Sequence, residues 1–259
     1  MYRKKEKATL MVKAVLVDVT KCIGCRGCQV SCKRWNDLPG EQTTLNTSWT
    51  NPPTLSYTTY THIQFKFDES NGSPAWQFLN WRCMHCTEAA CLEACPVDAI
   101  VKTSEGAVVI QTEKCIGCKY CISACPFGIP QWDGQLEKVS KCHMCFDRIS
   151  DGKEPACVQA CPTDALVFGE RAEIISLATQ RKAKINGHIY GDVDNKPLGG
   201  TGFIYVADVQ LQTLGLPDVG EQLSADIPVM ANSKLLLVPA AVGGLFYLAA
   251  WRKKRMEED

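Results

Sequence analysis

The spacing of the cysteines constrains this 259-residue chain more than any other feature, because all 16 of them fall into four groups of four. The first and third groups follow C-x2-C-x2-C-x3-C, the second C-x2-C-x4-C-x3-C, and the fourth C-x2-C-x11-C-x3-C. The quartets are Cys22, Cys25, Cys28 and Cys32; Cys83, Cys86, Cys91 and Cys95; Cys115, Cys118, Cys121 and Cys125; and Cys142, Cys145, Cys157 and Cys161. Such a pattern excludes an ordinary enzyme with one reactive cysteine.

Three kinds of cysteine chemistry compete for these groups. Disulfides fit poorly, because cysteines packed this closely in tight loops are badly placed to pair with each other. Structural zinc tolerates C-x2-C pairs but usually takes two pairs separated by a longer span. Three close cysteines and a fourth before a proline match the bacterial ferredoxin pattern, and the first quartet departs from it at one position, where Lys33 replaces that proline. The spacing therefore predicts four 4Fe–4S clusters.

The ferredoxin pattern also predicts which cysteines share a cluster, because its fourth cysteine binds the neighbouring cluster. The second and third quartets are close in sequence and are expected to exchange their fourth cysteines, as the first and fourth then do around them. The predicted sets are Cys22, Cys25, Cys28 and Cys161 (cluster 1); Cys32, Cys142, Cys145 and Cys157 (cluster 2); Cys83, Cys86, Cys91 and Cys125 (cluster 3); and Cys95, Cys115, Cys118 and Cys121 (cluster 4).

This crossing implies an α+β fold in which one ferredoxin-like module is nested inside another. The related stretches CPVDAI at 95–100 and CPTDAL at 161–166 support the repeat. Residue patterns predict strands at 14–18, 63–67, 108–110, 166–168 and 203–206, and a helix at 170–178. The predicted domains are a four-cluster domain at 1–170 with the inner module inserted at about 80–130, a docking extension at 171–232, a transmembrane helix at 233–251 and a basic tail at 252–259.

Other function classes find little support. The 28 basic and 28 acidic residues cancel, which argues against a nucleic-acid-binding protein. No C-x2-C pair is followed by histidine, so c-type haem attachment is absent, and Gly199, Gly200 and Gly202 match no dinucleotide fingerprint. His85 and His143 lie inside cysteine loops that already supply four thiolates, so we expect packing or supporting roles for them. No catalytic nucleophile–base pair is evident.

Cations stand beside several cysteine loops and offer two interpretations. They either raise cluster potentials through their charge, or they only balance cluster charge and lie in solvent. The residues concerned are Lys21, Arg26, Lys33, Lys114, Lys119 and Lys141.

The C-terminal residues change in character. An uncharged stretch of 17 residues at 235–251 would form a helix of about 25 Å, near the short end for a membrane span. A buried helix is the alternative, but the basic run at 252–255 and the nearby Tyr247 and Trp251 favour a membrane anchor with a cytoplasmic C-terminus. The cluster domain would then face outward, and since the N-terminus lacks a secretory apolar region, export would require a partner that carries a signal.

The quartets, the motif KCIGCRGC at 21–28, the motif KRWNDLP at 33–39 and the turn GGT at 199–201 together resemble the four-cluster subunits of molybdopterin oxidoreductases. Among these, the chain is most similar to the iron–sulfur beta subunits of membrane-bound respiratory formate dehydrogenases. That resemblance implies a relay from a molybdenum or tungsten pterin catalytic alpha subunit to a membrane cytochrome b gamma subunit, alongside membrane lipid.

Two alternatives remain open at this point. The cysteine pattern is shared with relay subunits of hydrogenases and of other molybdopterin reductases, so it determines the clusters better than the substrate. A second class of function is a membrane assembly scaffold that the clusters merely stiffen. In every case the chain has no catalytic residues of its own and takes part in an oxidoreductase complex.

Overall fold

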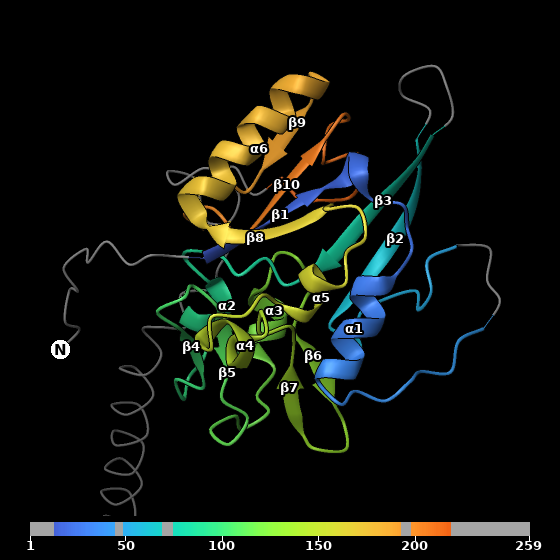
Figure 1. The fold of residues 1–259 in the computed structure, drawn as a ribbon. Coiled ribbons are helices and arrows are strands. Elements are labelled where there is room, and N and C mark those ends of the chain that lie inside the picture. Colours follow the sequence, from blue (N-terminus) through green and yellow to red (C-terminus); the bar gives the residue numbers. More distant parts are fainter. Residues whose placement is uncertain (1–12, 45–48, 69–74, 193–197, 219–259) are drawn as a thin grey trace, which may run out of the picture. The chain divides into compact units, whose positions relative to one another are not determined.

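The computed structural model describes residues 13–44, 49–68, 75–192 and 198–218, and the fold is built around a four-stranded sheet with short helices and hairpins beside it (Figure 1). The elements of the sheet are β1 (Lys13–Asp18), β8 (Leu166–Glu170), β9 (His188–Tyr190) and β10 (Phe203–Ala207), in the order β8-β1-β10-β9. The central strand β1 runs antiparallel to β8 and parallel to β10. The N-terminal strand therefore finds both its neighbours late in the chain.

One face of this sheet is covered by α6 (Arg171–Ile185), whose Ile174 and Ala178 pack against Leu16 of β1 and Ile204 of β10. The alternate residues of the same strands face the cysteine loops instead, because side chains alternate across a strand. Both faces of β1 and β10 are thus buried, which explains their unbroken runs of apolar residues.

The remaining strands form three antiparallel hairpins. The pairs are β2 (Thr61–Asp68) with β3 (Ala75–Arg82), β4 (Ile100–Lys102) with β5 (Val108–Ile110), and β6 (Gln131–Asp133) with β7 (Lys138–Ser140). The long hairpin β2–β3 projects beside the sheet and ends directly before the second quartet of cysteines (Figure 1). The two shorter hairpins flank the second and third quartets.

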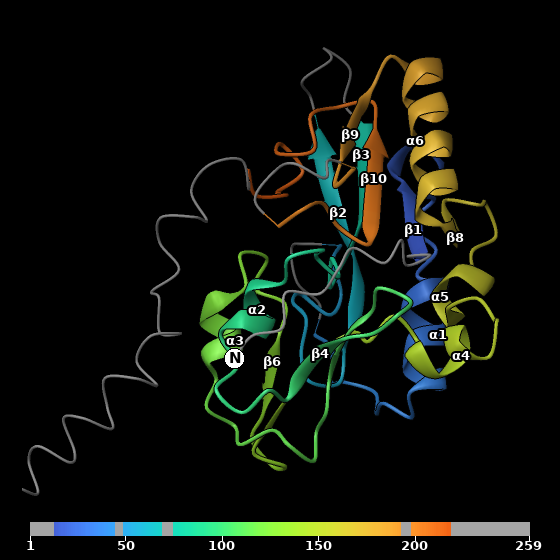
Figure 2. The same ribbon diagram turned by 90° about the vertical axis from the view of Figure 1, so that its left-hand side faces the viewer.

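Short helices hold five of the 16 cysteines, and the others lie in the loops beside them. The helices are α1 (Gly27–Trp35), α2 (Ala90–Glu93), α3 (Tyr120–Ala124), α4 (Phe146–Ser150) and α5 (Ala156–Gln159), and a 3₁₀ turn η1 (Val19–Lys21) leads from β1 into the first quartet. Helix α1 packs against α5, and α2 packs against α3. Figure 2 shows these two pairs on opposite sides of the molecule. The pairing brings the first quartet to the fourth and the second to the third.

All the predicted strands and the predicted helix are present, and the helix extends further than expected, to Ile185. The repeat at 95–100 and 161–166 recurs in the backbone, since Asp98 and Asp164 have the same left-handed φ of 52° and each precedes a strand. Aspartate tolerates this conformation better than most residues. The segment from α6 to β10 completes the sheet of β1 and β8, and its role in docking stays a prediction.

Membrane insertion was predicted for a part of the chain that the structure does not describe. Within the described residues, no helix combines the length and the apolar character that a membrane crossing requires. The predicted span at 233–251 and the basic tail at 252–259 lie outside those residues.

Candidate cluster-binding sites

The first cysteine site lies between the start of α1 and the end of α5. Its cavity is lined by four cysteines, Cys22, Cys25, Cys28 and Cys161. Three come from the first quartet and the fourth from the last, which is the crossed combination predicted for cluster 1. Val17 and Ile63 close the cavity from the neighbouring strands.

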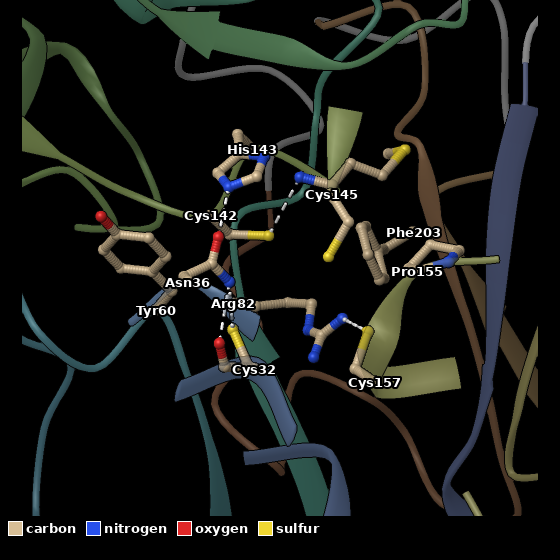
Figure 3. A pocket seen from close by; sticks show the side chains of 11 residues that line it. Cys32, Asn36, Tyr60, Arg82, Cys142, His143, Cys145, Pro155, Cys157 and Phe203 are labelled. Carbon is tan, nitrogen blue, oxygen red and sulfur yellow. Dashed lines mark hydrogen bonds between the residues drawn. The ribbon is translucent and has the colours of Figure 1, made fainter. Parts of the chain in front are cut away.

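A second cavity lies further along the same two helices. Its four cysteines are Cys32, Cys142, Cys145 and Cys157, the set predicted for cluster 2 (Figure 3). Cys28 and Cys32 are one helical turn apart on α1, so this single helix supplies a thiol to each of the two cavities. Asn36, Tyr60, Arg82 and Phe203 are among the other residues that line the second cavity.

The inner pair of quartets repeats this arrangement around α2 and α3. Cys95, Cys115, Cys118 and Cys121 line one cavity, as predicted for cluster 4. The last predicted set is also brought together, because the thiol of Cys86 interacts electrostatically with those of Cys83, Cys125 and Cys91. The structure therefore groups all 16 cysteines in the four crossed sets.

Electrostatic interactions between thiols connect each set with the next one. Cys28 of the first set interacts with Cys157 of the second, and Cys142 of the second interacts with Cys83 of the third. Cys91 of the third set in turn interacts with Cys121 of the fourth. The order along the molecule is therefore cluster site 1, 2, 3 and 4.

The two ends of this row differ from its middle in exposure. Cys25 in the first set and Cys118 in the fourth are exposed to solvent, whereas all four cysteines of the second set are buried. An electron entering or leaving such a row would do so most readily at the exposed ends.

The thiols themselves are suited to metal binding, not to catalysis as free groups. Burial raises the pKa of Cys28 and of Cys145 to about 12, and that of Cys142 to about 11. A free thiol here would be protonated and unreactive at neutral pH, so metal insertion must displace protons. Soft thiolates in sets of four are the ligands that iron–sulfur clusters take.

The cysteines surround cavities, which is the arrangement needed when each thiolate binds a different iron of a cluster. Among the described residues, no group of three or more His, Cys, Asp or Glu side chains converges on one point as ligands of a single metal ion would. The four-thiol cavities fit 4Fe–4S clusters by donor type and number.

Arg82, at the end of β3, is the functional residue that sequence reasoning missed. It is fully buried, and its Nη1 donates a hydrogen bond of 2.9 Å to Sγ of Cys157 (Figure 3). Burial alone would lower the pKa of Arg82, but the thiols of Cys157, Cys142 and Cys28 raise it. The available signal was its position directly before Cys83, the same offset at which lysines precede the other three quartets.

Two amide side chains also face sulfur. Nδ2 of Asn80, two residues before Arg82 on the same face of β3, lies 3.2 Å from Sγ of Cys28. Nδ2 of Asn36 lies 3.7 Å from Sγ of Cys32 and donates to the carbonyl of that residue at 2.8 Å. Hydrogen bonds of this kind to ligating sulfurs influence cluster potentials.

The six cations beside the cysteine loops differ in their exposure and contacts. Lys21 and Lys114 are exposed, Arg26 lies over the ring of Phe65, and Lys119 lies over that of Trp132.

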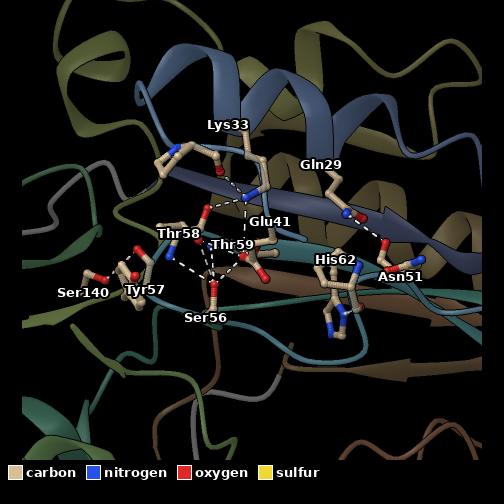
Figure 4. Close-up of polar contacts among 12 residues, drawn as sticks. Gln29, Lys33, Glu41, Asn51, Ser56, Tyr57, Thr58, Thr59, His62 and Ser140 are labelled. Atoms are coloured by element: carbon tan, nitrogen blue, oxygen red, sulfur yellow. Dashed lines mark hydrogen bonds and ion pairs between the residues drawn. The ribbon is translucent and has the colours of Figure 1, made fainter. Parts of the chain in front are cut away.

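Lys33 bonds to the carbonyls of Pro39 and Thr58 and pairs with Glu41 at 3.5 Å (Figure 4). Lys141 is the buried member of the six, and it donates to the carbonyls of Val108 and Cys142. Burial would lower the pKa of Lys141, but the thiols of Cys83, Cys91 and Cys142 raise it.

Both loop histidines are held by hydrogen bonds. Nδ1 of His85 accepts from the backbone N–H of Val108 at 2.9 Å, and complete burial keeps the pKa of His85 well below its usual value. Nε2 of His143 donates to Oδ1 of Asn36 at 2.5 Å. These contacts agree with the supporting roles expected of them, which stay a prediction.

Family models and relatives identify the kind of protein that this chain is. Two models described as 4Fe-4S dicluster domain match residues 21–99 and 74–171. The nitrate-inducible formate dehydrogenase iron–sulfur subunit of Escherichia coli K12 is 44% identical over 197 residues, which cover 74% of this chain and 67% of the relative. The formate dehydrogenase iron–sulfur subunit of Haemophilus influenzae is 39% identical over 243 residues, covering 90% of this chain and 77% of the relative.

This chain belongs to the iron–sulfur subunits of formate dehydrogenase. A formate dehydrogenase beta subunit of Nitratidesulfovibrio vulgaris, labelled cytochrome c-553, is also 38% identical over 183 residues, or 67% of this chain and 83% of the relative. Membership of this family confirms the predicted resemblance, the ferredoxin-like modules and the presence of several 4Fe–4S clusters. The protein is an electron-transfer subunit and not itself a catalytic enzyme.

Proposed function

We propose that this chain holds four 4Fe–4S clusters in the crossed ligand sets and relays electrons along them in the order 1, 2, 3, 4. The observation that carries the proposal is that cysteines from quartets far apart in sequence line common cavities, each with four thiols. When bound, each cluster accepts and releases one electron. The protein positions the sulfurs, excludes water from the middle of the row and supplies hydrogen bonds and charge.

The partners follow from the exposed ends of the row and from the family. A catalytic subunit with a molybdenum or tungsten pterin would oxidise formate and deliver electrons at one end, and a membrane cytochrome b would receive them at the other for transfer to quinone. The exposed Cys25 and Cys118 support two separate points of exchange. Ile23 and Ile116 beside them are also exposed, as contact surfaces for partner subunits would be.

The proposed location is the cell membrane. The apolar residues at 233–251 would cross it once, with the basic residues at 252–255 on the cytoplasmic side and the cluster domain on the outer side. Mass spectrometry of the intact complex, extracted from native membranes in mild detergent, tests both partners and location. Recovery of the chain alone from the soluble fraction would contradict them.

The ligand sets can be tested more sharply. In the crossed arrangement, neighbouring cysteines of one quartet bind different clusters. Cys28→Ala and Cys161→Ala should abolish the same cluster signal in electron paramagnetic resonance (EPR), and Cys32→Ala should abolish the signal that Cys142→Ala abolishes. Wild-type protein purified anaerobically should contain about 16 iron atoms per chain. If Cys28→Ala and Cys32→Ala remove the same signal, the crossing is wrong.

The same samples separate a relay from a scaffold. A relay requires that all four clusters are reduced by formate through the catalytic partner and reoxidised by a quinone analogue. Clusters that stay oxidised in the presence of formate, in a complex with its full iron content, would support a structural role instead.

A further inference from the structure

Arg82 lies between the first and second cluster sites without belonging to either ligand set. Its guanidinium lines the second cavity and donates to Sγ of Cys157, and it also interacts electrostatically with Cys28 of the first set. Arginine keeps its charge at any pH at which a protein is folded. The molecule thus maintains a permanent positive charge between two neighbouring sites.

The charge is held in one position by contacts on its other sides. Nε and Nη2 donate to Oγ1 of Thr61 at 3.1 and 2.9 Å, and the guanidinium lies 4.8 Å from the centre of the Phe203 ring. Thr61 is paired with Arg82 across the β2–β3 hairpin and Phe203 belongs to β10, so one neighbouring and one distant strand fix the side chain. Within the described part of the chain no carboxylate pairs with Arg82, and the groups of negative character that it faces are cysteine sulfurs.

Burying an arginine is costly unless its charge is compensated. The compensation available to Arg82 is the negative charge of the ligating thiolates and of the clusters that they bind. Reduction adds one electron to a cluster and makes it more negative, so a nearby fixed cation stabilises the reduced state more than the oxidised state. The cost of burying Arg82 is therefore offset most in the reduced protein.

We propose that Arg82 is a redox-tuning residue that raises the reduction potential of the second cluster, and that of the first cluster to a smaller extent. The larger effect falls on the second cluster because Arg82 donates a hydrogen bond to one of its sulfurs, whereas it reaches the first by charge alone. This inference rests on the cluster assignment proposed above. It assigns Arg82 no part in holding iron.

The chain provides a matched control at the same sequence offset. Lys114 precedes Cys115 as Arg82 precedes Cys83, but Lys114 is exposed, where water screens its charge. Loss of the Lys114 charge should therefore leave all four potentials unchanged.

The test is an EPR-monitored redox titration of the intact complex, purified anaerobically, in wild type, Arg82→Gln, Arg82→Lys and Lys114→Gln. A Cys157→Ser variant identifies the signal of the second cluster. We expect Arg82→Gln to lower the midpoint of that signal most and the first cluster's midpoint less, with Arg82→Lys between Arg82→Gln and wild type and Lys114→Gln unchanged. Unchanged midpoints in Arg82→Gln with full iron content would overturn the proposal.

A spectroscopic measurement decides the matter if Arg82→Gln does not retain its iron. Wild-type complex containing ¹⁵N-labelled arginine should show nitrogen hyperfine coupling to the reduced second cluster, and Arg82→Lys should lose it. Absence of that coupling in wild type would overturn the hydrogen bond to the ligating sulfur. Failure of the cluster assignment itself is recognised separately, by the cysteine variants described above.

Discussion

The four cysteine loops fall into two pairs that differ in burial although each supplies the same number of thiols. The first and third quartets begin with the identical sequence KCIGC, and their isoleucines, Ile23 and Ile116, are 60% and 63% exposed. The second and fourth begin RCMHC and KCHMC, and their methionines, Met84 and Met144, are 1% exposed. In the proposed relay, the exposed loops hold the end clusters and the buried loops hold the middle ones.

Segments from elsewhere in the chain cover the second and fourth cysteine loops, so their burial does not follow from the sequence of the loops themselves. The turn before β10 covers the second quartet, where the N–H of Gly202 donates to the carbonyl of Met84 at 2.8 Å. The excursion between α1 and β2 covers the fourth quartet, since Ser140 donates to the carbonyl of Tyr57, and Tyr60 lines the second cavity. In the proposed relay, these covering segments would determine which clusters exchange electrons with partners and which only pass them on.

The largest expected effect on stability comes from truncating a buried side chain in one of the buried cysteine loops. Met144→Ala should destabilise the fold by about 2–5 kcal/mol, because it leaves a cavity beside the second cluster site. Ile116→Ala, in an exposed loop, should stay within about 0.5 kcal/mol of wild type. Anaerobic thermal unfolding followed by circular dichroism, together with iron analysis, compares the two. Equal losses in both variants would remove the distinction between buried and exposed loops.

An exposed loop nevertheless has a sensitive position in its backbone. Gly117 has a φ of +70°, and an added Cβ would lie 2.5 Å from the carbonyl oxygen of Glu137. Gly117→Ala should cost about 1–2 kcal/mol for the left-handed backbone and about 1–3 kcal/mol more for the clash.

Gly128→Ala is the matched control for that variant, because Gly128 has a φ of +61° with no atom within 4 Å of the added Cβ. It should show the backbone cost alone. Thermal unfolding of both variants measures the difference. A Gly117→Ala protein as stable as Gly128→Ala would mean that the loop moves away freely.

The lysines that precede the cysteine loops should also differ: replacing the one at a buried loop should affect stability and cluster midpoint, and replacing the one at an exposed loop should not. Lys141→Gln removes a buried donor and leaves two carbonyls short of a partner, at a cost of about 1–3 kcal/mol. Because Lys141 faces Cys83 and Cys91, the variant should also lower the midpoint of the third cluster. Lys21→Gln, at the exposed first loop, should change neither stability nor midpoint. A redox titration that shifted equally in both variants would contradict this.

The smallest expected effect concerns the excursion that covers the fourth quartet. Burial alone would raise the pKa of Glu41, but hydroxyl donors from Ser56, Thr59 and Thr58 and the charge of Lys33 lower it below its ordinary value (Figure 4). Glu41→Gln should cost about 1 kcal/mol at pH 7.

The pH dependence of that cost has a definite sign. A folded pKa below the unfolded value of about 4.3 contributes stability above that pH, and this contribution disappears as the pH falls through the folded pKa. Wild type and Glu41→Gln should therefore converge in thermal stability as the pH falls through the lowered folded pKa of Glu41. The exposed Glu93→Gln serves as the control. A stability gap for Glu41→Gln that persists unchanged into acid would exclude the carboxylate as its origin.

Much of this architecture could be predicted because local sequence determines it. The strands at 108–110 and 203–206 could be predicted from their short apolar runs, and the crossed grouping of the cysteines from a spacing whose fourth cysteine binds the neighbouring cluster. The ligand sets themselves stay a prediction until the cysteine variants are measured.

Burial could not be predicted in the same way, because it depends on segments far away in the chain. Arg82, Lys114 and Lys141 occupy the same offset before a quartet, yet Phe203 of the late strand β10 covers Arg82, whereas Lys114 lies in solvent. The polar face of β3 was equally hidden, since Asn80 and Arg82 look unremarkable within a strand of aromatic and apolar residues. Tertiary contacts turn them into neighbours of sulfur.

The position of β1 in the middle of its sheet has a consequence for the timing of synthesis. Its residues 13–18 pair with 166–170 and 203–207, so the first strand made is among the last to be completed. At about 5–20 residues per second, β1 is without either neighbour for about 8–30 seconds, until β8 has been made. The hairpin β4–β5 needs only the first 110 residues and forms much earlier. In a nascent chain, the second and third quartets would therefore be available for iron insertion while the first and fourth still lacked the sheet that positions them.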